Sequence, residues 1–324
     1  MPKKVFLISI GLFCLTGMSF NWGFFAHKKI SRLAVFTLPP SLAGFYKKNI
    51  DYLTEASVNP DRRRYAIPEE APRHYIDLDD YGDSAAYTLP RYWNQAVERY
   101  GKDTLEARGI LPWHIHRVYI QLKEAFLLQD PEKILRLSSD LSHYIADAHV
   151  PLHTTRNYDG QLTNQVGIHG FWESRLPELF FEQYDFYVGT ASYVPNIQLA
   201  AWAMVQQSNQ AVDSVLNVEL QLSRSTPSKF SFESKGKQTI RVYSQEYSKK
   251  YHHALNGMVE RFFRNSVKRT GDFWYTAWVD AGQPDLNRLI GYKPTAEELE
   301  KRKQELQQWK EHTVKAREHE GSEN

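Results

Sequence analysis

Residues 130–153 read DPEKILRLSSDLSHYIADAHVPLH, and this pattern predicts one complete helix. Asp130 and Pro131 form a typical helix start, because an aspartate caps the first free amides and proline is tolerated at the first helical position. Apolar residues then recur with a period close to 3.6, at positions 134, 135, 137, 141 and 145. Pro151 ends the pattern, so a group of histidines lies at the carboxyl end of this predicted helix.

The rest of the chain carries further patterns that are typical of helices. Residues 112–129 repeat their apolar positions with a helical period, and residues 196–222 and 246–269 are predicted to be two more long helices. Residues 225–239 (STPSKFSFESKGKQT) are polar and rich in turn formers, which predicts a surface loop or a short hairpin. We therefore predict an all-α fold with a single mainly helical domain. Its aromatic content of 14% is expected mainly to fill the core.

The two ends of the chain differ from the part between them. Residues 1–21 combine a basic start, an apolar run and a short polar end, which predicts a signal peptide and export to the periplasm or beyond. An uncleaved leader would act as an anchor instead. The only cysteine, Cys14, lies in this segment, so no disulfide is expected in the mature chain. Residues 22–290 are predicted to form the main domain, and residues 291–324 a charged C-terminal helix.

The net charge argues against a duplex-binding protein. The chain has 40 Lys and Arg and 38 Asp and Glu, and loss of Lys3 and Lys4 with the leader leaves 38 against 38. Proteins that bind duplexes usually carry a clear basic surplus. The run from Arg62 to Arg64 is expected to be a solvated face.

Two pairs of side chains near the predicted helix end carry metal-binding chemistry. His143 and Asp147 lie four residues apart and share one helix face, and His153 follows where the chain can turn back toward that face. His169 and Glu173, in IHGFWE, form a second pair with the same spacing. Imidazole and carboxylate are ligands of zinc, and the lack of cysteine ligands argues against a purely structural zinc site.

Three upstream residues strengthen the prediction of a metal site. They are Asp61 in VNPDRRR, His74 in PRHYID and His27 in WGFFAH. Either His–carboxylate pair alone would more often be an ion pair or a helix-end hydrogen bond, so the accumulation of candidates carries the prediction. His149 points elsewhere on the helix and is expected to support a ligand or to pack in the core.

These segments resemble the zinc-dependent phospholipase C and single-strand-specific nuclease superfamily, whose members hold a trinuclear zinc cluster in a mainly helical fold. HYIADAHVPLH is similar to the family segment H-[FY]-x-x-D-x-x-x-P-[LM]-H. IHGFWE is similar to the His-x-x-Trp-Asp of the nuclease branch, with the Glu of the phospholipase branch in the last position. WGFFAH resembles the nuclease-type start, in which tryptophan is the first mature residue. The resemblance covers residues 22–180.

The resemblance implies three zinc ions per chain and a ligand set for each. Asp61, His74, His143 and Asp147 would hold the first ion; His153, His169 and Glu173 the second; and Trp22, through its α-amino group and carbonyl oxygen, the third with His27 and the bridging Asp147. Asp61 is also implied as the catalytic residue that orients or deprotonates water. Asp51 and Asp77 are the alternatives for the role of Asp61. Three Zn²⁺ bring +6 and the three carboxylates return −3, so the cluster would attract an anion such as a phosphodiester.

The implied function is a secreted zinc-dependent phosphodiester hydrolase, acting as a monomer without a stable protein partner. A nuclease on single-stranded DNA or RNA, an endonuclease that also cleaves 3′-nucleotides, is favoured by the spacing of Trp22 and His27 and by Trp172. Bases would then stack on aromatics near the ligands; the candidates are Tyr75, Tyr158 and Phe171. The alternative is a phospholipase C, favoured by Glu173 and the absent basic surplus. A lesser alternative is a catalytically degenerate, exported helical binding module.

Overall fold

The helix predicted from the histidine-rich stretch is α9 (Pro131–Asp147), and it lies at the centre of the molecule. In this computed structural model, which describes residues 24–226, 228–235 and 238–311, α9 packs against α8, α14, α3 and α1. Its predicted cap is confirmed, because the carboxylate of Asp130 accepts a hydrogen bond from the Lys133 amide at 3.0 Å. The helix ends at Asp147, ahead of a short 3₁₀ turn η4 (Pro151–Thr154).

The other elements confirm the prediction of an all-α fold, and the described residues form one mainly helical domain. The helices are α1 (Phe24–Ala34), α2 (Pro40–Lys48), α3 (Ile50–Ala56), α4 (Asn59–Arg64), α5 (Ala85–Thr88), α6 (Trp93–Tyr100), α7 (Lys102–Arg108), α8 (Leu111–Leu127), α10 (Ile168–Gly170), α11 (Leu176–Phe180), α12 (Ile197–Ser225), α13 (Gln245–Ala254), α14 (Met258–Asp280) and α15 (Ala296–Glu311). The described strands are β1 (Phe230–Lys235) and β2 (Gln238–Tyr243). Among the described residues, no helix is both long and apolar enough to cross a lipid bilayer.

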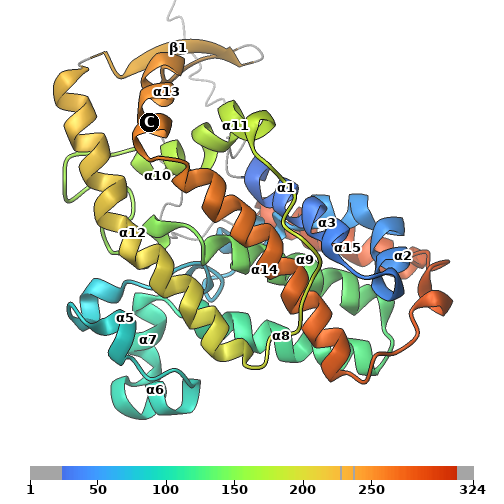
Figure 1. Cartoon of the computed structure of the whole chain (residues 1–324). Coiled ribbons are helices and arrows are strands. Elements are labelled where there is room, and N and C mark those ends of the chain that lie inside the picture. The colour runs from blue at the N-terminus through green and yellow to red at the C-terminus, as the bar shows by residue number, and fades with distance from the viewer. Residues whose placement is uncertain (1–23, 227, 236–237, 312–324) are drawn as a thin grey trace, which may run out of the picture.

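The long helices cross in two layers and close the main core between them. In Figure 1, α12 and α14 run diagonally across the front, with α8 and α9 behind them. Large aromatic side chains fill the space: Trp202 and Trp274 are almost completely buried, and Trp274 Nε1 donates to the carbonyl of Ser138 at 3.0 Å. The high aromatic content therefore serves mainly the core, as predicted.

One predicted helix is wrong in its extent. Residues 246–269 were expected to form a single helix, but α13 and α14 are separate, with a break at Asn256 and Gly257. Both residues have positive φ values, 49° and 71°, which end a right-handed helix. The apolar period continues through the break, so periodicity alone does not reveal it.

The polar segment after α12 was predicted to be a surface loop or a short hairpin, and it carries the two strands of a hairpin. Strands β1 and β2 pair antiparallel, with Phe230 opposite Tyr243. The hairpin packs on a second apolar cluster, in which the rings of Phe171 and Tyr243 stack at 3.8 Å. An ion pair between Arg175 and Glu233 ties it to the segment that follows α10. The hairpin therefore supports residues 171–175 through these two contacts.

The charged C-terminal helix, α15, lies against the body of the protein near α4. The Arg302 guanidinium pairs with Glu132 at the start of α9 and covers the ring of Tyr52 at 4.2 Å. Trp309 lies against Arg63 of α4, with 5.7 Å between the guanidinium carbon and the ring centre. Residues 312–324, the predicted leader and Trp22 lie outside the described residues.

Candidate metal centre

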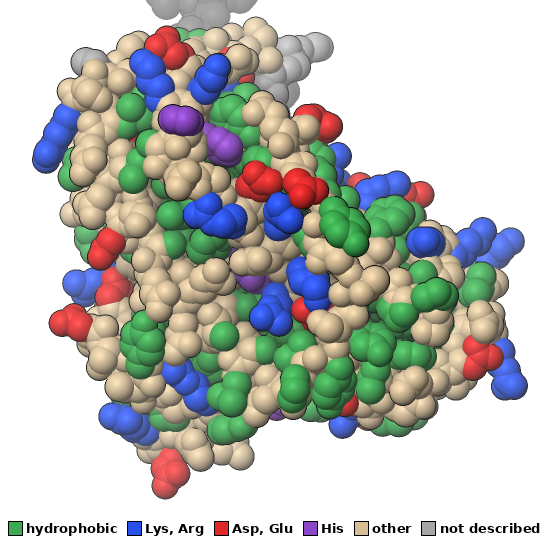
Figure 2. Space-filling view, in the orientation of Figure 1, with side chains coloured by type: hydrophobic (Ala, Val, Ile, Leu, Met, Phe, Trp, Pro, Cys, Tyr) green, Lys and Arg blue, Asp and Glu red, His purple; other side chains and the backbone are tan. Residues whose placement is uncertain are grey.

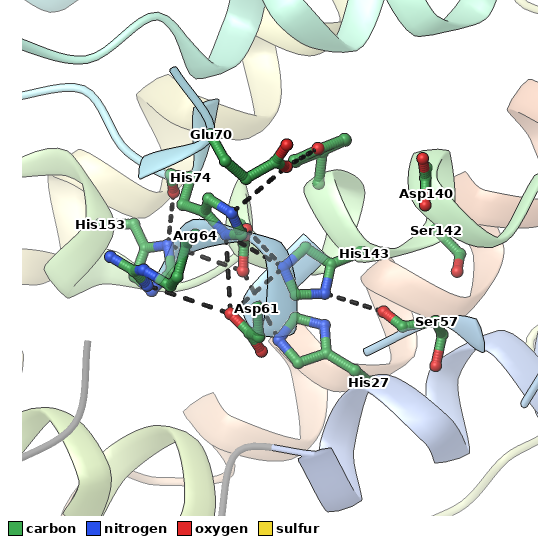
Figure 3. A network of polar contacts seen from close by, with 12 residues as sticks. His27, Ser57, Asp61, Arg64, Glu70, His74, Asp140, Ser142, His143 and His153 are labelled. Atoms are coloured by element: carbon green, nitrogen blue, oxygen red, sulfur yellow. Dashed lines mark hydrogen bonds and ion pairs between the residues drawn. The ribbon is translucent and has the colours of Figure 1, made fainter. Parts of the chain in front are cut away.

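The first group of candidate ligands surrounds the carboxyl end of α9. His143 Nε2 lies 3.2 Å from Asp147 Oδ2, so the predicted pair shares one face of the helix. His74, just after the 3₁₀ turn η2 (Ala71–Arg73), places Nδ1 at 3.0 Å from each of these atoms. Asp61 on α4 adds Oδ1 at 3.6 Å from His143 Nε2 and 3.7 Å from His74 Nδ1. Figure 3 shows the side chains of Asp61, His74 and His143 converging from separate elements.

The second group joins the turn after α9 to the segment around α10. His153 Nε2 lies 3.1 Å from His169 Nε2. Glu173 Oε2 lies 2.8 Å from His169 Nε2 and 3.4 Å from His153 Nε2, so the three atoms form a closed triangle. Glu173 belongs to a single π-helical turn, η5 (Phe171–Arg175), a rare local structure that is frequent at functional sites.

The third group links the other two through shared carboxylates. His27 of α1 places Nε2 at 3.5 Å from Asp147 Oδ1 and 3.3 Å from Glu173 Oε1. Asp147 thus directs one oxygen to the first group and one to the third, and Glu173 does the same for the second and third. The link between His27 and Glu173 was not predicted. Each of the groups His74–His143–Asp147, His153–His169–Glu173 and His27–Asp147–Glu173 could hold a metal ion, as could His27–Asp61–His143.

Backbone carbonyls fix how three of the histidines present their nitrogens. The Nδ1 atoms of His143, His153 and His169 donate to the carbonyls of residues 57, 74 and 158, at 2.9, 2.6 and 3.1 Å. A carbonyl oxygen can only accept, so each Nδ1 carries the hydrogen and each neutral ring offers the lone pair of Nε2. This arrangement is the usual support of metal-binding histidines.

Two carboxylates of the centre, those of Asp147 and Glu173, have lowered pKa values although they are buried. Burial alone would raise their pKa values, but His143 and His153 hold the pKa of Asp147 well below its usual range. The imidazoles of His153, His169 and His27 do the same for the pKa of Glu173. Burial lowers the pKa of His27, but the carboxylates of Glu173 and Asp147 outweigh it and raise that pKa to about 9.

Several buried polar atoms of the centre lack hydrogen bonds among the described residues. They are Oδ1 of Asp61, Oδ1 of Asp147 and both ring nitrogens of His27. Buried charged atoms are costly unless they are paired or bind an ion. A cation between these groups would satisfy them together, so the residues present fit a metal ion.

The loop before α10 is built tightly and sets the position of His169. The carboxylate of Asp159 accepts hydrogen bonds from the amides of Gly167 at 3.0 Å and His169 at 3.3 Å. Gly160 has a φ of +73°, and a side chain there would meet the carbonyl oxygen of Gln165 at 2.6 Å. The loop therefore requires glycine at position 160.

Two features describe the contact of the centre with solvent. Asp61 is 7% exposed, more than any other described candidate ligand. On the α14 side a cavity of about 30 Å³ lies between His27, His149, Trp172 and Glu173. That volume suits a water or two and excludes a phosphodiester. Asp61 is therefore the described candidate ligand in most contact with solvent.

The structure brings together all the predicted ligands that it describes. These are His27, Asp61, His74, His143, Asp147, His153, His169 and Glu173. Of the alternatives for Asp61, Asp51 is exposed and pairs with Arg32, and Asp77 belongs to none of the groups. His149 is buried outside the ligand groups and donates to the carbonyl of Ile145, in agreement with its predicted supporting or core place.

Two expectations about side chains near the centre need correction. The run from Arg62 to Arg64 is not a solvated face: Arg64 is 1% exposed, with Nη1 at 3.9 Å from Asp61 Oδ1, and Arg63 pairs with the buried carboxylate of Glu70. The helical period of α4 turns these side chains inward, which the charge pattern alone does not reveal. Phe171, a candidate for base stacking, is buried in the second apolar cluster together with Trp172 and offers no stacking surface. Tyr75 and Tyr158, the other two candidates, are only partly buried.

Sequence reasoning missed one buried acidic residue next to the centre. Glu70 has no exposed surface, and Oε1 lies 3.7 Å from His74 Nε2. Its spacing of four residues from His74 is the signal that could have revealed it.

No model of a known protein family matches this chain, and no curated protein matches it significantly.

Proposed function

We propose that the protein is a zinc-dependent phosphodiester hydrolase with three zinc ions per chain. The observation that carries the proposal is the pair of bridging carboxylates, Asp147 and Glu173, which join three buried ligand groups into one centre. Nitrogen and oxygen ligands around tetrahedral zinc lie about 3.3 Å apart, because each is about 2 Å from the ion. The separations in the first two groups, from 2.8 Å between His169 and Glu173 to 3.7 Å between His74 and Asp61, bracket this value.

The charge of such a centre favours an anionic substrate. Three zinc ions contribute +6, and Asp61, Asp147 and Glu173 return −3. When bound, zinc polarises a phosphoryl oxygen and lowers the pKa of a bound water to about 7. In this proposal Asp61, the most exposed of the described candidate ligands, would orient the attacking water or accept its proton.

Arg64 supports the same class of reaction. Its guanidinium lies beside Asp61 on the next turn of α4 and is almost fully buried. A guanidinium in a dry site binds phosphate oxygens more strongly than an exposed one does. We assign Arg64 the role of binding the phosphoryl group as its negative charge grows.

Within this class we give first place to single-stranded nucleic acid and 3′-nucleotides, because of the motifs resembling those of the nuclease branch. Tyr75 and Tyr158, which are both partly buried, are the remaining candidates for base stacking, and Tyr158 lies in the loop that holds His169. Figure 2 shows basic and acidic side chains interspersed on the face viewed, without a continuous basic stripe, which fits a local contact better than a long duplex.

One observation favours a phospholipase C as the second candidate. Leu162 and Val166, in the same loop, are 61% and 63% exposed. Exposed aliphatic side chains beside the site would suit a lipid substrate better than a nucleotide. A degenerate centre in a binding module, the lesser alternative, would hold clearly fewer than three zinc ions per chain.

The deciding experiment compares substrates on one preparation. Purified, zinc-loaded protein is incubated with single-stranded DNA, RNA, a 3′-nucleotide and phosphatidylcholine vesicles, and the released products are measured. The proposal expects phosphodiester cleavage that a chelator abolishes and added zinc restores. Cleavage of phosphatidylcholine alone selects the second candidate, and full zinc occupancy without any cleavage refutes the assignment as a hydrolase of these substrates.

Export and the free amine at Trp22 belong to the same proposal. Cleavage between Asn21 and Trp22 would create the α-amino ligand for the third ion and release a monomer outside the cytoplasm. N-terminal sequencing of the mature protein tests this step. A chain that begins at Met1 contradicts it.

A further inference from the structure

Glu70 lies beside the centre but belongs to none of the ligand groups. It is completely buried, and its carboxylate accepts hydrogen bonds from three side chains that lie on different elements. The Tyr144 hydroxyl donates to Oε1, Arg63 donates from Nε and Nη2 at 3.2 and 3.3 Å, and Arg73 donates at 2.6 Å. This many charged and polar contacts would fix the carboxylate in one orientation.

Glu70 faces His74, and His74 differs from the other histidines of the first two groups in the ring nitrogen that it directs toward the centre. His143, His153 and His169 direct Nε2 toward the centre, whereas His74 directs Nδ1 there. Its Nε2 lies 3.7 Å from Glu70 Oε1, on the far side of the ring from Asp61 (Figure 3). Where the other three rings have a backbone carbonyl behind them, His74 has a carboxylate.

We propose that Glu70 is a positioning residue for the first metal ion: it keeps the hydrogen of His74 on Nε2 and leaves Nδ1 to bind the metal. This inference rests on the proposed metal centre. A carboxylate behind a ligand histidine fixes the tautomer and orientation of the ring and increases its basicity. Because 3.7 Å separates Glu70 Oε1 from His74 Nε2, the interaction is electrostatic. The negative charge of Glu70 therefore matters more than the shape of its side chain.

The support of Glu70 reaches the C-terminal helix through Arg63. This guanidinium also binds both oxygens of Asp140 on α9, at 3.2 and 3.1 Å, and Trp309 of α15 covers it. Burial by itself would raise the pKa of Glu70, but Arg63 and its neighbours hold it well below its usual range.

Tyr144 couples this support to the helix that carries the ligands. It follows His143 directly, and its ring packs edge-on against His74 and His143, with centroids 5.5 Å away in each case. Its hydroxyl holds Glu70, so the helix α9 and the carboxylate behind His74 are fixed relative to one another.

The test compares Glu70→Gln with Asp140→Asn in the full chain. Both changes remove one negative charge from the partners of Arg63 and keep the side-chain size, but only Glu70 faces His74. Zinc affinity is measured by competition with a chromophoric chelator, and the metal-free proteins are melted to verify folding. In Glu70→Gln we expect one of the three ions to bind about 10- to 100-fold more weakly, with excess zinc restoring three ions per chain. Asp140→Asn is expected to bind all three as the wild type does.

Each result has a distinct meaning. A wild-type protein that binds no zinc refutes the metal centre itself. A wild type that binds three ions, with Glu70→Gln binding them equally tightly, overturns the role of Glu70 alone. An equal loss in Asp140→Asn also overturns it, because the effect would then come from Arg63 and general packing. If Glu70→Gln does not fold, the same measurement is made on Tyr144→Phe, which loses one hydrogen bond to Glu70. The proposal expects one of the three zinc ions to bind more weakly to this variant, and an unchanged zinc affinity contradicts it.

Discussion

His153 and His169 face each other through Nε2 atoms that lie 3.1 Å apart, although a backbone carbonyl fixes the hydrogen of each ring on Nδ1. Two neutral rings in this state would direct lone pairs at one another. A metal ion between them would remove the repulsion and would also bind the carboxylate of Glu173, which faces both nitrogens. The second ligand group could therefore hold a cation.

Zinc should stabilise the folded protein strongly. Binding to the native state alone adds about 2.7 kcal/mol for each site when free zinc is a hundred times the dissociation constant. We therefore expect the melting temperature of metal-free protein to rise by more than 5 °C on adding zinc, in a calorimetric scan. Magnesium, which prefers six oxygen ligands, is the control and should have little effect. Equal shifts with both ions would contradict a nitrogen-rich site.

Asp147→Asn should remove two ions at once. This residue contributes one oxygen to the first group and one to the third, whereas the second group does not need it. The zinc content measured by elemental analysis is expected to fall from three ions per chain toward one, and phosphodiester cleavage is expected to be lost. His149→Asn is the matched control, since His149 is also a buried residue at the end of α9 but lies outside the groups. Full zinc content in Asp147→Asn would show that the carboxylate does not bridge.

Zinc uptake should release a proton from His27 at pH 8. Its pKa rises from 6.5 to about 9 in the metal-free protein, so the ring is still protonated at that pH and must lose the proton to bind zinc. For the metal-free fold, the stabilisation from this raised pKa is complete below pH 6.5 and is lost as the pH rises through about 9.

Calorimetry in buffers with different ionisation enthalpies measures this proton release. His27→Gln should release about one proton fewer than the wild type at pH 8, and the difference should vanish above pH 9. Equal proton release by the two proteins at pH 8 would show that the proton comes from a group other than His27.

Arg64→Gln should impair catalysis without loss of zinc. Because the guanidinium is assigned to the phosphoryl group, kcat/KM for a phosphodiester should fall about 100-fold or more, by analogy with removal of one transition-state hydrogen-bond donor. Arg62→Gln is the control, since Arg62 lies on the same helix but binds Asn59. If the two variants lose activity equally, the effect belongs to α4 as a whole and not to Arg64.

Local signals predicted much of the fold and the candidate ligand pairs four residues apart. The start of α9 was predictable because Asp130 and Pro131 act on amides within one turn, and His143 and Asp147 because a helix aligns residues four apart. The break between α13 and α14 was equally local, but its signal is the conformation of Asn256 and Gly257, not hydrophobicity.

Features that depend on distant segments were not predictable in this way. The contact of His27 with Glu173 joins α1 to η5, and that of Arg63 with Asp140 joins α4 to α9. No spacing in the sequence indicates either contact, because both arise only when the helices pack. The inward direction of Arg64 is of the same kind, since a charged run is more often solvated than buried.

The most direct test of the central claim is anomalous X-ray scattering at the zinc edge from crystals of the purified, mature protein. We predict three peaks, one among Asp61, His74, His143 and Asp147, one among His153, His169 and Glu173, and one beside His27 between the two bridging carboxylates. A crystal grown with zinc present that shows no peak within bonding distance of these side chains would contradict the metal centre and the function proposed from it.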